Sequence, residues 1–403
     1  MKENLTKTRE VLSQYREDYA LCSKCKICHG NHVQEVNHAR FFRNCPSGSR
    51  FRYEAYYASG RMELARALNL KEITVTPQYK HALYTCMECG SCQEQCYPVK
   101  QIWPLRVIEL LREKAVAEGW GLLPEHEPYL KNLEESDNLF GKPQAERDRL
   151  IVELGVKDAA KEKCAVLLFT GCRYAFKPET KQTLKSAVNL LKKAGADVGL
   201  LGSQEICCGA PLLEMGDRDF FEVFAAENIR RFDATGAETV ISLCSHCASV
   251  FAEEYAPFMG STPLHITQFL SAALAGGDLK ATKKLKATVA WHDPCRLGRR
   301  LKEYDAPRAI LDAIPGLKRV ELERSRHNAL CCGNGGMAGA IFPEYGVWVA
   351  NERMYEAEFA EIDTLVTACP WCEEMLDNGK RERNSSVKVE NILNLLNASV
   401  GGK

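Results

Sequence analysis

The chain has 403 residues, which is long enough for two or three domains. Hydrophobic residues make up 45% and charged residues 26%, and the formal net charge is zero. This is the composition of a soluble globular protein without bulk attraction to nucleic acid or anionic lipid. The amino terminus is polar, and no window approaches the ~18 consecutive apolar residues of a membrane span. We therefore expect a cytoplasmic protein, one that can still dock on a membrane partner.

The most informative residues are the 19 cysteines. Disulfide frameworks are typical of short secreted chains, so metal ligation or redox chemistry is the preferred interpretation for a chain of this length. All but one of the cysteines fall into four groups, two in the first hundred residues and two in the C-terminal part.

The first group is a triple at three-residue intervals, Cys22, Cys25 and Cys28, with Cys45 following after a long insert. Cys45 precedes a proline, as the last cysteine of a ferredoxin run does, but the insert departs from the usual spacing. The insert carries three histidines, His29, His32 and His38. Because four cysteines suffice for a cluster, we expect these histidines to be surface or hydrogen-bonding residues rather than ligands.

The second group follows the ferredoxin run and consists of Cys86, Cys89, Cys92 and Cys96. Three closely spaced thiolates can wrap a 4Fe–4S cubane, whereas structural zinc usually takes two pairs separated by a longer loop. In two-cluster ferredoxins the last cysteine of each run binds the other cluster. The expected ligand sets are therefore Cys22, Cys25, Cys28 and Cys96 for one cubane and Cys86, Cys89, Cys92 and Cys45 for the other.

An amphipathic helix is predicted from Ile102 to Gly119, with Pro104 in its first turn. We expect a helical 4Fe–4S ferredoxin-type domain over residues 1–120. The glycine- and proline-containing stretch over 121–160 has no cysteine and is predicted to be a connector.

The C-terminal part contains an internal repeat. Cys172, Cys207–Cys208 and the pair Cys244 and Cys247 recur as Cys295, Cys331–Cys332 and the pair Cys369 and Cys372. Apolar strand-like runs lead into the cysteines (Ala165–Cys172 and Ala287–Cys295, then AETVISLC and IDTLVTAC), and a helix is predicted over Leu184–Val198. This alternation predicts two α/β units with mostly parallel sheets, over 161–282 and 283–403, with the cysteines at strand ends.

Adjacent cysteines in Cys207-Cys208-Gly209 and Cys331-Cys332-Gly333 do not suit one tetrahedral zinc, but neighbouring thiolates can bind separate irons of a cluster. Five cysteines per unit exceed the four that a cubane requires, which points to an unusual cluster or an open site with a reactive thiolate. A scaffold of four or five zinc sites is disfavoured for the same reason. Cys164 lies outside the groups and is expected to be a buried, inert thiol.

This pattern resembles the cysteine-rich CCG domain of heterodisulfide reductase catalytic subunits. Two such units behind a two-cluster helical domain resemble the D-type catalytic subunit of that family, a fusion of the cluster-carrying C and catalytic B types. The phrases that match closely are HDPCRLGR (His292–Arg299), CCGNGG (Cys331–Gly336) and CPWC (Cys369–Cys372). The first unit (TGCRYAF, CCGAPLLEMGD and CSHC) matches with more variation.

The resemblance implies a further 4Fe–4S cluster, cubane or noncubane, in each unit. Its ligands would be Cys172, Cys207, Cys208, Cys244 and Cys247 in the first unit, and Cys295, Cys331, Cys332, Cys369 and Cys372 in the second. The resemblance also implies that the two clusters face one another across a shared cavity, each binding one sulfur of a split disulfide. Arg173, Arg296, Arg299 and His292 flank ligand cysteines and are candidates for binding an anionic substrate or tuning a cluster, with hydrogen bonds to backbone or to a partner as the alternative.

The implied function is electron transfer from the two cubanes to the CCG clusters for disulfide reduction, in a complex with a flavin- or cluster-containing donor subunit. The alternative is a relay subunit without its own substrate, as in complexes of the benzoyl-CoA reductase type, membrane complexes of sulfate reducers, or glycolate and lactate dehydrogenases. We find no flavin or nucleotide fingerprint, and the glycine-rich segment Gly333–Gly336 is better explained by packing near a cluster.

Overall fold

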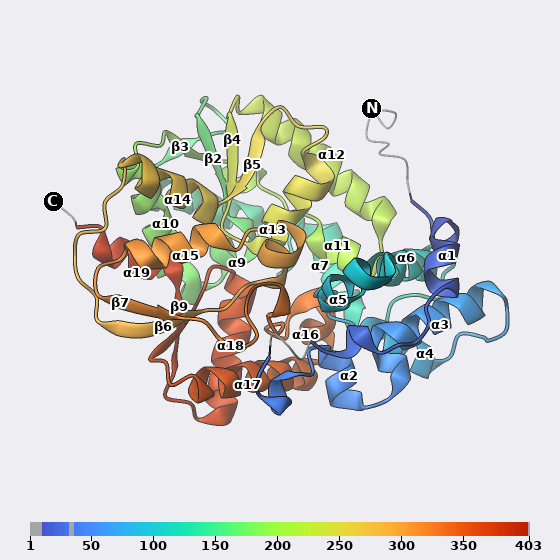
Figure 1. The fold of residues 1–403 in the computed structure, drawn as a ribbon. Coiled ribbons are helices and arrows are strands. Elements are labelled where there is room, and N and C mark those ends of the chain that lie inside the picture. The colour runs from blue at the N-terminus through green and yellow to red at the C-terminus, as the bar shows by residue number, and fades with distance from the viewer. Residues whose placement is uncertain (1–9, 32–35, 402–403) are drawn as a thin grey trace.

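The computed structural model describes residues 10–31 and 36–401. Figure 1 shows the N-terminal helices grouped beside two sheets, one formed by β2–β5 and the other including β6, β7 and β9. Within the described residues, no helix is both long and apolar enough to cross a bilayer.

The described residues before the first strand form short helices. They are α1 (Arg16–Ala20), α2 (Pro46–Phe51), α3 (Ala58–Asn69), α4 (Pro77–Tyr84), α5 (Ser91–Lys100), α6 (Pro104–Ala117), α7 (Glu127–Ser136) and α8 (Asp148–Leu154). The predicted helix over Ile102–Gly119 is α6, which begins at Pro104 because proline suits the first turn. Its Val107, Ile108 and Leu111 are buried in a small core with α3 and α4.

The first sheet is parallel and has the order β1-β3-β2-β4-β5. Its strands are β1 (Lys157–Asp158), β2 (Val166–Phe169), β3 (Val198–Leu200), β4 (Thr239–Ser242) and β5 (Thr262–His265). The associated helices are α9 (Gly171–Phe176), α10 (Lys181–Lys193), α11 (Ala210–Met215), α12 (Arg218–Ala234), α13 (Ser245–Val250) and α14 (Ile266–Gly276).

The second sheet is parallel and has the order β7-β6-β8-β9. Its strands are β6 (Ala287–Trp291), β7 (Leu317–Val320), β8 (Thr364–Thr367) and β9 (Lys388–Asn391). Its helices are α15 (Asp305–Ala313), α16 (Ala338–Ile341), α17 (Pro343–Phe359), α18 (Pro370–Arg383) and α19 (Ile392–Ser399). The order repeats β3-β2-β4-β5 of the first sheet, so the predicted α/β repeat is confirmed.

Both bounds predicted for one helix were wrong, because α10 begins at Lys181 and not at Leu184. The helix expected over Leu184–Val198 is α10, which ends at Lys193. Gly195 follows with φ +80°, a left-handed conformation that terminates helices. Val198 is instead the first residue of β3 and is buried in the sheet.

The two sheets are joined by a reciprocal helix interface. α10 packs on α19, and α14 packs on α15. Ser186 on α10 donates to Asn394 on α19 at 2.9 Å, and Asn394 donates in turn to Thr183 at 3.1 Å. Because α10 corresponds to α15 and α14 to α19 in the repeat, each unit uses the same pair of helices, which is the pattern of a twofold interface.

Buried His126 makes the stability of the protein sensitive to acid. Burial, with Arg112 nearby, lowers the pKa of His126 to about 4. Below the ordinary histidine pKa of ~6.5, His126 is protonated in the unfolded chain but stays neutral in the folded one. Acid therefore favours the unfolded chain, and the free energy of unfolding drops by up to about 3 kcal/mol between pH 6.5 and 4. Denaturant titrations at several pH values should show a shallower decline for His126→Asn. Equal slopes in the variant and the natural protein would contradict this prediction.

Candidate functional site

The ten cysteines of the repeat lie at the carboxyl ends of the parallel strands and in the loops beside them. Cys172 follows β2 and Cys244 follows β4, while Cys295 follows β6 and Cys369 follows β8. This is the edge where open α/β sheets place their sites. The glycine of each CCG loop has a left-handed φ, +76° at Gly209 and +106° at Gly333, a conformation that glycine adopts without strain.

The first cysteine set comprises Cys172, Cys207, Cys208, Cys244 and Cys247, all buried. Side-chain hydrogen bonds connect them as a chain, from Cys172 through Cys207, Cys208 and Cys247 to Cys244. Hydrogen bonds with Cys207 and Cys247 lower the pKa of Cys208 to about 5. A lowered pKa favours the thiolate, which is the form of cysteine that binds metal.

The second cysteine set comprises Cys295, Cys331, Cys332, Cys369 and Cys372, also all buried. It repeats the same chain, from Cys295 through Cys331, Cys332 and Cys372 to Cys369. Hydrogen bonds with Cys331 and Cys372 lower the pKa of Cys332 to about 6. The two copies thus share their local chemistry as well as their spacing.

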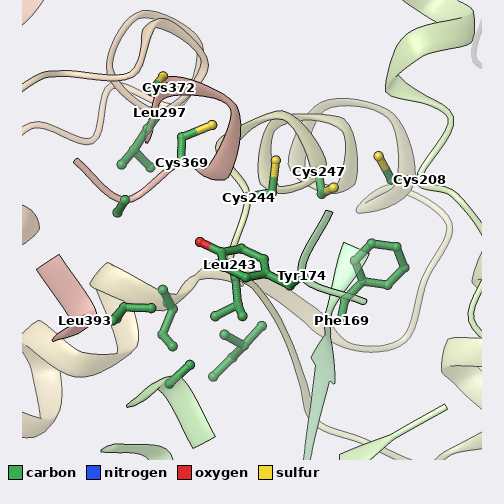
Figure 2. Close-up of a cluster of buried hydrophobic side chains, with 14 of the residues drawn as sticks. Phe169, Tyr174, Cys208, Leu243, Cys244, Cys247, Leu297, Cys369, Cys372 and Leu393 are labelled. Carbon is green, nitrogen blue, oxygen red and sulfur yellow. The ribbon is translucent and has the colours of Figure 1, made fainter. Parts of the chain in front are cut away.

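The two sets meet at Cys244 and Cys369. Their sulfur atoms and a ring nitrogen of His246 all lie within 4.8 Å of one another. Figure 2 shows Cys208, Cys247 and Cys244 continuing across the view into Cys369 and Cys372. Burial alone would lower the pKa of His246, but Glu214 and hydrogen bonds with Cys244 and Cys369 raise it well above its ordinary value. His246 was missed as a site residue, although its place inside CSHC was a signal.

A cavity of about 280 Å³ opens on the first set, and all five of its cysteines line it. Phe140, Trp371 and Met375 form apolar walls, and Lys177 is a cation at the same cavity. The residues that line the cavity include none of the cysteines of the second set. The resemblance implies a cavity shared by both cysteine sets, whereas the thiols that line this cavity all belong to the first set.

The predicted connector is part of this site. Leu139 and Phe140 line the cavity, and Arg147 donates to the sulfur of Cys172 at 3.9 Å. Arg147 is itself held by Glu205, a buried carboxylate that also accepts the backbone N–H groups of Thr170 (2.9 Å) and Gly171 (2.8 Å). Glu205 thereby fixes the loop that carries Cys172.

A smaller cavity of about 40 Å³ adjoins this one and is lined by charged groups, with Glu214 and His246 common to both. Predicted Arg296 lies here, 2.6 Å from Glu214 and 3.3 Å from Glu88. Its charge is therefore compensated within the protein.

Arg173, Arg299 and His292, the other residues predicted beside ligand cysteines, have different partners. Arg173 lines the large cavity and pairs with Glu374 at 2.7 Å. Arg299 donates to the carbonyl of Cys89 at 3.0 Å. His292 accepts from Arg353 Nε at 3.2 Å through Nδ1, which leaves its Nε2 proton without a hydrogen-bond partner among the described residues. A ring nitrogen of His292 and the sulfur atoms of Cys332 and Cys372 lie within 4.8 Å of one another.

The N-terminal cysteines also come together across the sequence. Burial and then the thiols of Cys22 and Cys25 raise the pKa of Cys96 to about 11. Burial raises the pKa of Cys45 to about 11, and Cys89 and Cys86 add to that shift. Each of the two distal cysteines therefore has thiols of the other run as neighbours.

The histidines of the insert have other partners. His29 is hydrogen-bonded to Ser59 at 3.0 Å and stacks on Tyr57. His38 accepts the N–H of Arg40 at 3.3 Å, and His32 lies outside the described residues. Cys164 is only 3% exposed and lies against Gly199 in the core.

The donor sets fit iron–sulfur clusters. Each C-terminal set is all thiol and buried, and the pKa of its central cysteine is lowered, while the unpartnered Nε2 proton of His292 suits a cluster sulfur as acceptor. Zinc, which takes four ligands, would leave a fifth buried thiol in each set unused.

Comparison with known proteins identifies the family. Residues 166–252 and 289–377 match the family described as "CCG: Cysteine-rich domain". The D subunit of the dihydromethanophenazine:CoB--CoM heterodisulfide reductase of Methanosarcina barkeri is 30% identical over 335 residues, covering 80% of this chain and 79% of that protein. The EtfAB:quinone oxidoreductase of Syntrophomonas wolfei is 28% identical (78% and 46% covered), and the B subunit of the CoM/CoB fumarate reductase of Methanothermobacter marburgensis is 31% identical (79% and 61% covered). The chain therefore belongs to the family of the heterodisulfide reductase D subunit, iron–sulfur oxidoreductases with two CCG domains.

Proposed function

We propose that the chain is a subunit of an oxidoreductase complex and reduces a disulfide in the large cavity. The reaction consumes two electrons and two protons and yields two thiols. The observation that carries this proposal is the convergence of five buried cysteines on one cavity of about 280 Å³. The name of the Methanosarcina barkeri relative supports a disulfide as the substrate class.

The two C-terminal cysteine sets would each hold a further 4Fe–4S cluster, cubane or noncubane. The eight N-terminal cysteines would hold two cubanes, with Cys96 and Cys45 exchanged between the two runs as expected from the sequence. When bound, such clusters supply electrons one at a time. A flavin- or cluster-containing partner subunit would deliver the electrons.

The residues around the cavity would bind the substrate and exclude water. Phe140 and Trp371 stack with ring centroids 6.0 Å apart and offer an apolar wall to an alkyl substituent. Lys177, whose Nζ lies 4.7 Å from the Phe140 ring centroid, would attract an anionic group at the same end. Arg173 is bound by Glu374 and would position Trp371, since its guanidinium lies 5.3 Å from that ring centroid.

A second function is favoured by a different observation. The Syntrophomonas wolfei relative, which matches 78% of this chain, is named for electron transfer to quinone rather than for disulfide reduction. In that case the chain would be a relay without a substrate of its own, as in complexes of the benzoyl-CoA reductase type, sulfate-reducer membrane complexes, or glycolate and lactate dehydrogenases.

Iron analysis and EPR spectroscopy of the anaerobically purified protein distinguish these functions. We expect about 16 irons per chain, four for each of four sites, and a new paramagnetic signal when a thiol is added to the oxidised protein. Cys25→Ser should remove irons without affecting the thiol-dependent signal, because Cys25 belongs to the N-terminal groups. Absence of any thiol- or disulfide-dependent signal in the natural protein would favour the relay.

A further inference from the structure

The exposure of the cysteines follows their place in the molecule. All ten cysteines of the repeat are buried. The cysteines of the second N-terminal run, together with Cys45, are partly or fully buried. Cys25, in the first N-terminal group, is the one exposed cysteine of the chain. A cluster bound by that group would therefore have one edge at the protein surface.

The second N-terminal run connects the first group to the repeat. Toward the repeat, burial raises the pKa of the Cys89 thiol, and neighbouring Cys295 adds to that shift. Toward the first group, burial raises the pKa of Cys96 to about 11, and neighbouring Cys22 and Cys25 add to that shift. Cys25 therefore stands at the surface end of a series of neighbouring thiols, where a partner protein can contact a ligand directly.

Large apolar side chains are exposed on both segments that carry the cysteines of this end. Leu21 precedes the first group, and Tyr97, Val99 and Trp103 follow Cys96. The rings of Tyr97 and Trp103 lie 4.3 Å apart between centroids. The backbone N–H of Trp103 donates at 2.6 Å to Asp18 on α1, the helix that ends just before Leu21. We call Leu21, Cys25, Tyr97, Val99 and Trp103 the docking face.

Exposed side chains of this kind are sparse on the rest of the molecule. Among the described residues after Trp103, the large hydrophobic side chains that are exposed are Val152, Val223 and Phe359. Single exposed apolar side chains are ordinary on a protein surface, whereas a group of them is typical of an interaction site. Aromatic rings such as those of Tyr97 and Trp103 are enriched at protein–protein interfaces.

The segments that form the docking face are positively charged. Residues 22–31 and 97–103 contain three lysines and no acidic residue. Lys24 pairs with Glu63 at 3.1 Å, whereas Lys26 and Lys100 are exposed and have no ion-pair partner among the described residues. Cations without a partner attract carboxylates and disfavour a basic surface. The chemistry of the docking face therefore selects an acidic protein.

We propose that the docking face binds the electron-donor subunit, and that this subunit presents an apolar centre surrounded by carboxylates. The proposal rests on the proposed function only in requiring a redox partner. Each electron passes from the partner's flavin or cluster to the cluster bound by the first group with Cys96. The donor is oxidised by one electron, that cluster is reduced by one, and no bond breaks.

A matched pair of valine variants tests the docking face. Val99 is 53% exposed and Val223 on α12 is 59% exposed, so Val99→Glu and Val223→Glu make the same change at similar exposure. Each full-length chain, with an affinity tag at its carboxyl terminus, is purified anaerobically from the cells in which it occurs. The flavin- or cluster-containing subunit that accompanies it is then quantified. We expect Val99→Glu to lower the amount of this donor subunit at least about tenfold, and Val223→Glu to retain it.

A small electron donor shows whether the clusters stay intact. The iron content of Val99→Glu, and its reduction by the methyl viologen radical, should equal those of the natural protein, because neither requires the docking face. Equal amounts of donor subunit with both variants would overturn the proposal. Recovery of the natural chain without any flavin- or cluster-containing subunit would overturn it as well.

Charge-reversal variants test the acidity of the partner and do not depend on Val99. Lys26→Glu and Lys100→Glu should each slow cluster reduction by the isolated donor subunit about tenfold at low ionic strength, and less at high ionic strength. Lys26→Arg and Lys100→Arg keep the charge and should keep the rate. Lys280→Glu changes an exposed lysine outside the docking face and should also keep the rate. An unchanged or faster rate in both reversal variants would contradict an acidic partner.

Other occupants of the docking face would give different results. If two copies of this chain met there, sedimentation would find the natural protein dimeric and Val99→Glu monomeric, with the donor subunit retained. If the face lay on a membrane, the natural protein would bind phosphatidylserine vesicles and Val99→Glu would not, again with the donor subunit retained. Either result would overturn the proposal.

Disulfide reduction is tested separately, because the thiol-dependent EPR signal requires no donor subunit. That signal together with equal donor recovery in both valine variants would refute the docking face alone. Absence of the signal, together with donor loss in Val99→Glu only, would refute disulfide reduction and leave the docking face supported.

Discussion

Replacing Arg112 by methionine is expected to lower the free energy of unfolding by about 3–5 kcal/mol, because the change removes one of the two cations that pair with buried Glu88 and leaves four buried carbonyls without their donor. Arg112 is fully buried on α6 and pairs with Glu88 at 3.0 Å. Its guanidinium donates to four backbone carbonyls, those of Leu83, Cys86, Glu214 and Gly336. These carbonyls belong to the N-terminal helices, the first unit and the second unit, so one side chain joins all three parts.

Anaerobic denaturant titration measures the loss, and hydrogen exchange locates it. Exchange should rise in α11 and in the Gly335–Gly336 loop, where Arg112 reaches the two units. Lys114→Met on the same helix is the control, because Lys114 makes a partly exposed ion pair with Glu118 worth less than about 1 kcal/mol. A loss for Arg112→Met no larger than that of the control would show that solvent or neighbouring groups satisfy the carbonyls.

Replacing Glu205 by alanine is expected to cost a similar 3–5 kcal/mol, and to damage the first cysteine set selectively. The change leaves Arg147 as a buried cation without its carboxylate, since Arg147 is only 1% exposed. The N–H groups of Thr170 and Gly171 and the hydroxyl of Thr170 lose their acceptor as well. Because this loop carries Cys172, we expect a loss of about four irons per chain.

Iron analysis, together with thermal denaturation, checks the second prediction. Glu238→Ala removes an exposed carboxylate from the same unit and should change stability by no more than about 0.5 kcal/mol, with the iron content unchanged. If Glu205→Ala lost irons from the N-terminal groups instead, the positioning role of Glu205 for the first set would be wrong.

The cysteine spacing predicted much of the site because ligand chemistry is local. Cys207–Cys208 and Cys331–Cys332 could be recognised as matched, and the α/β repeat around them followed from strand-like runs at constant offsets. The likeness between Cys208 and Cys332 extends to lowered pKa values in both. These features depend on contacts between cysteines of the same repeat unit, so the sequence of one unit is enough to predict them.

The contacts that set the two copies apart were not predictable in this way. Arg112 reaches Gly336 across more than two hundred residues, and Arg147 in the predicted connector reaches Cys172. No periodicity or motif encodes such pairs, because they depend on how separate elements pack. Gly335 and Gly336 were predicted to pack near a cluster. The structure shows that the backbone of Met87 and Cys86 lies against them, too close for a side chain at either position.

The reciprocal packing of α10 on α19 and α14 on α15 has a consequence for how the two copies came to differ. The same interface between two separate copies of one unit would close as a symmetric dimer, with the equivalents of Cys244 and Cys369 facing one another across its axis. In such a dimer every substitution occurs twice, so both CCG loops would have the same sequence and the same neighbours. Joining the copies in one chain removes that constraint, and Pro211 can stand in one loop while Gly335 stands in the other. The fusion is thus what permits two equivalent sites to have different neighbouring residues.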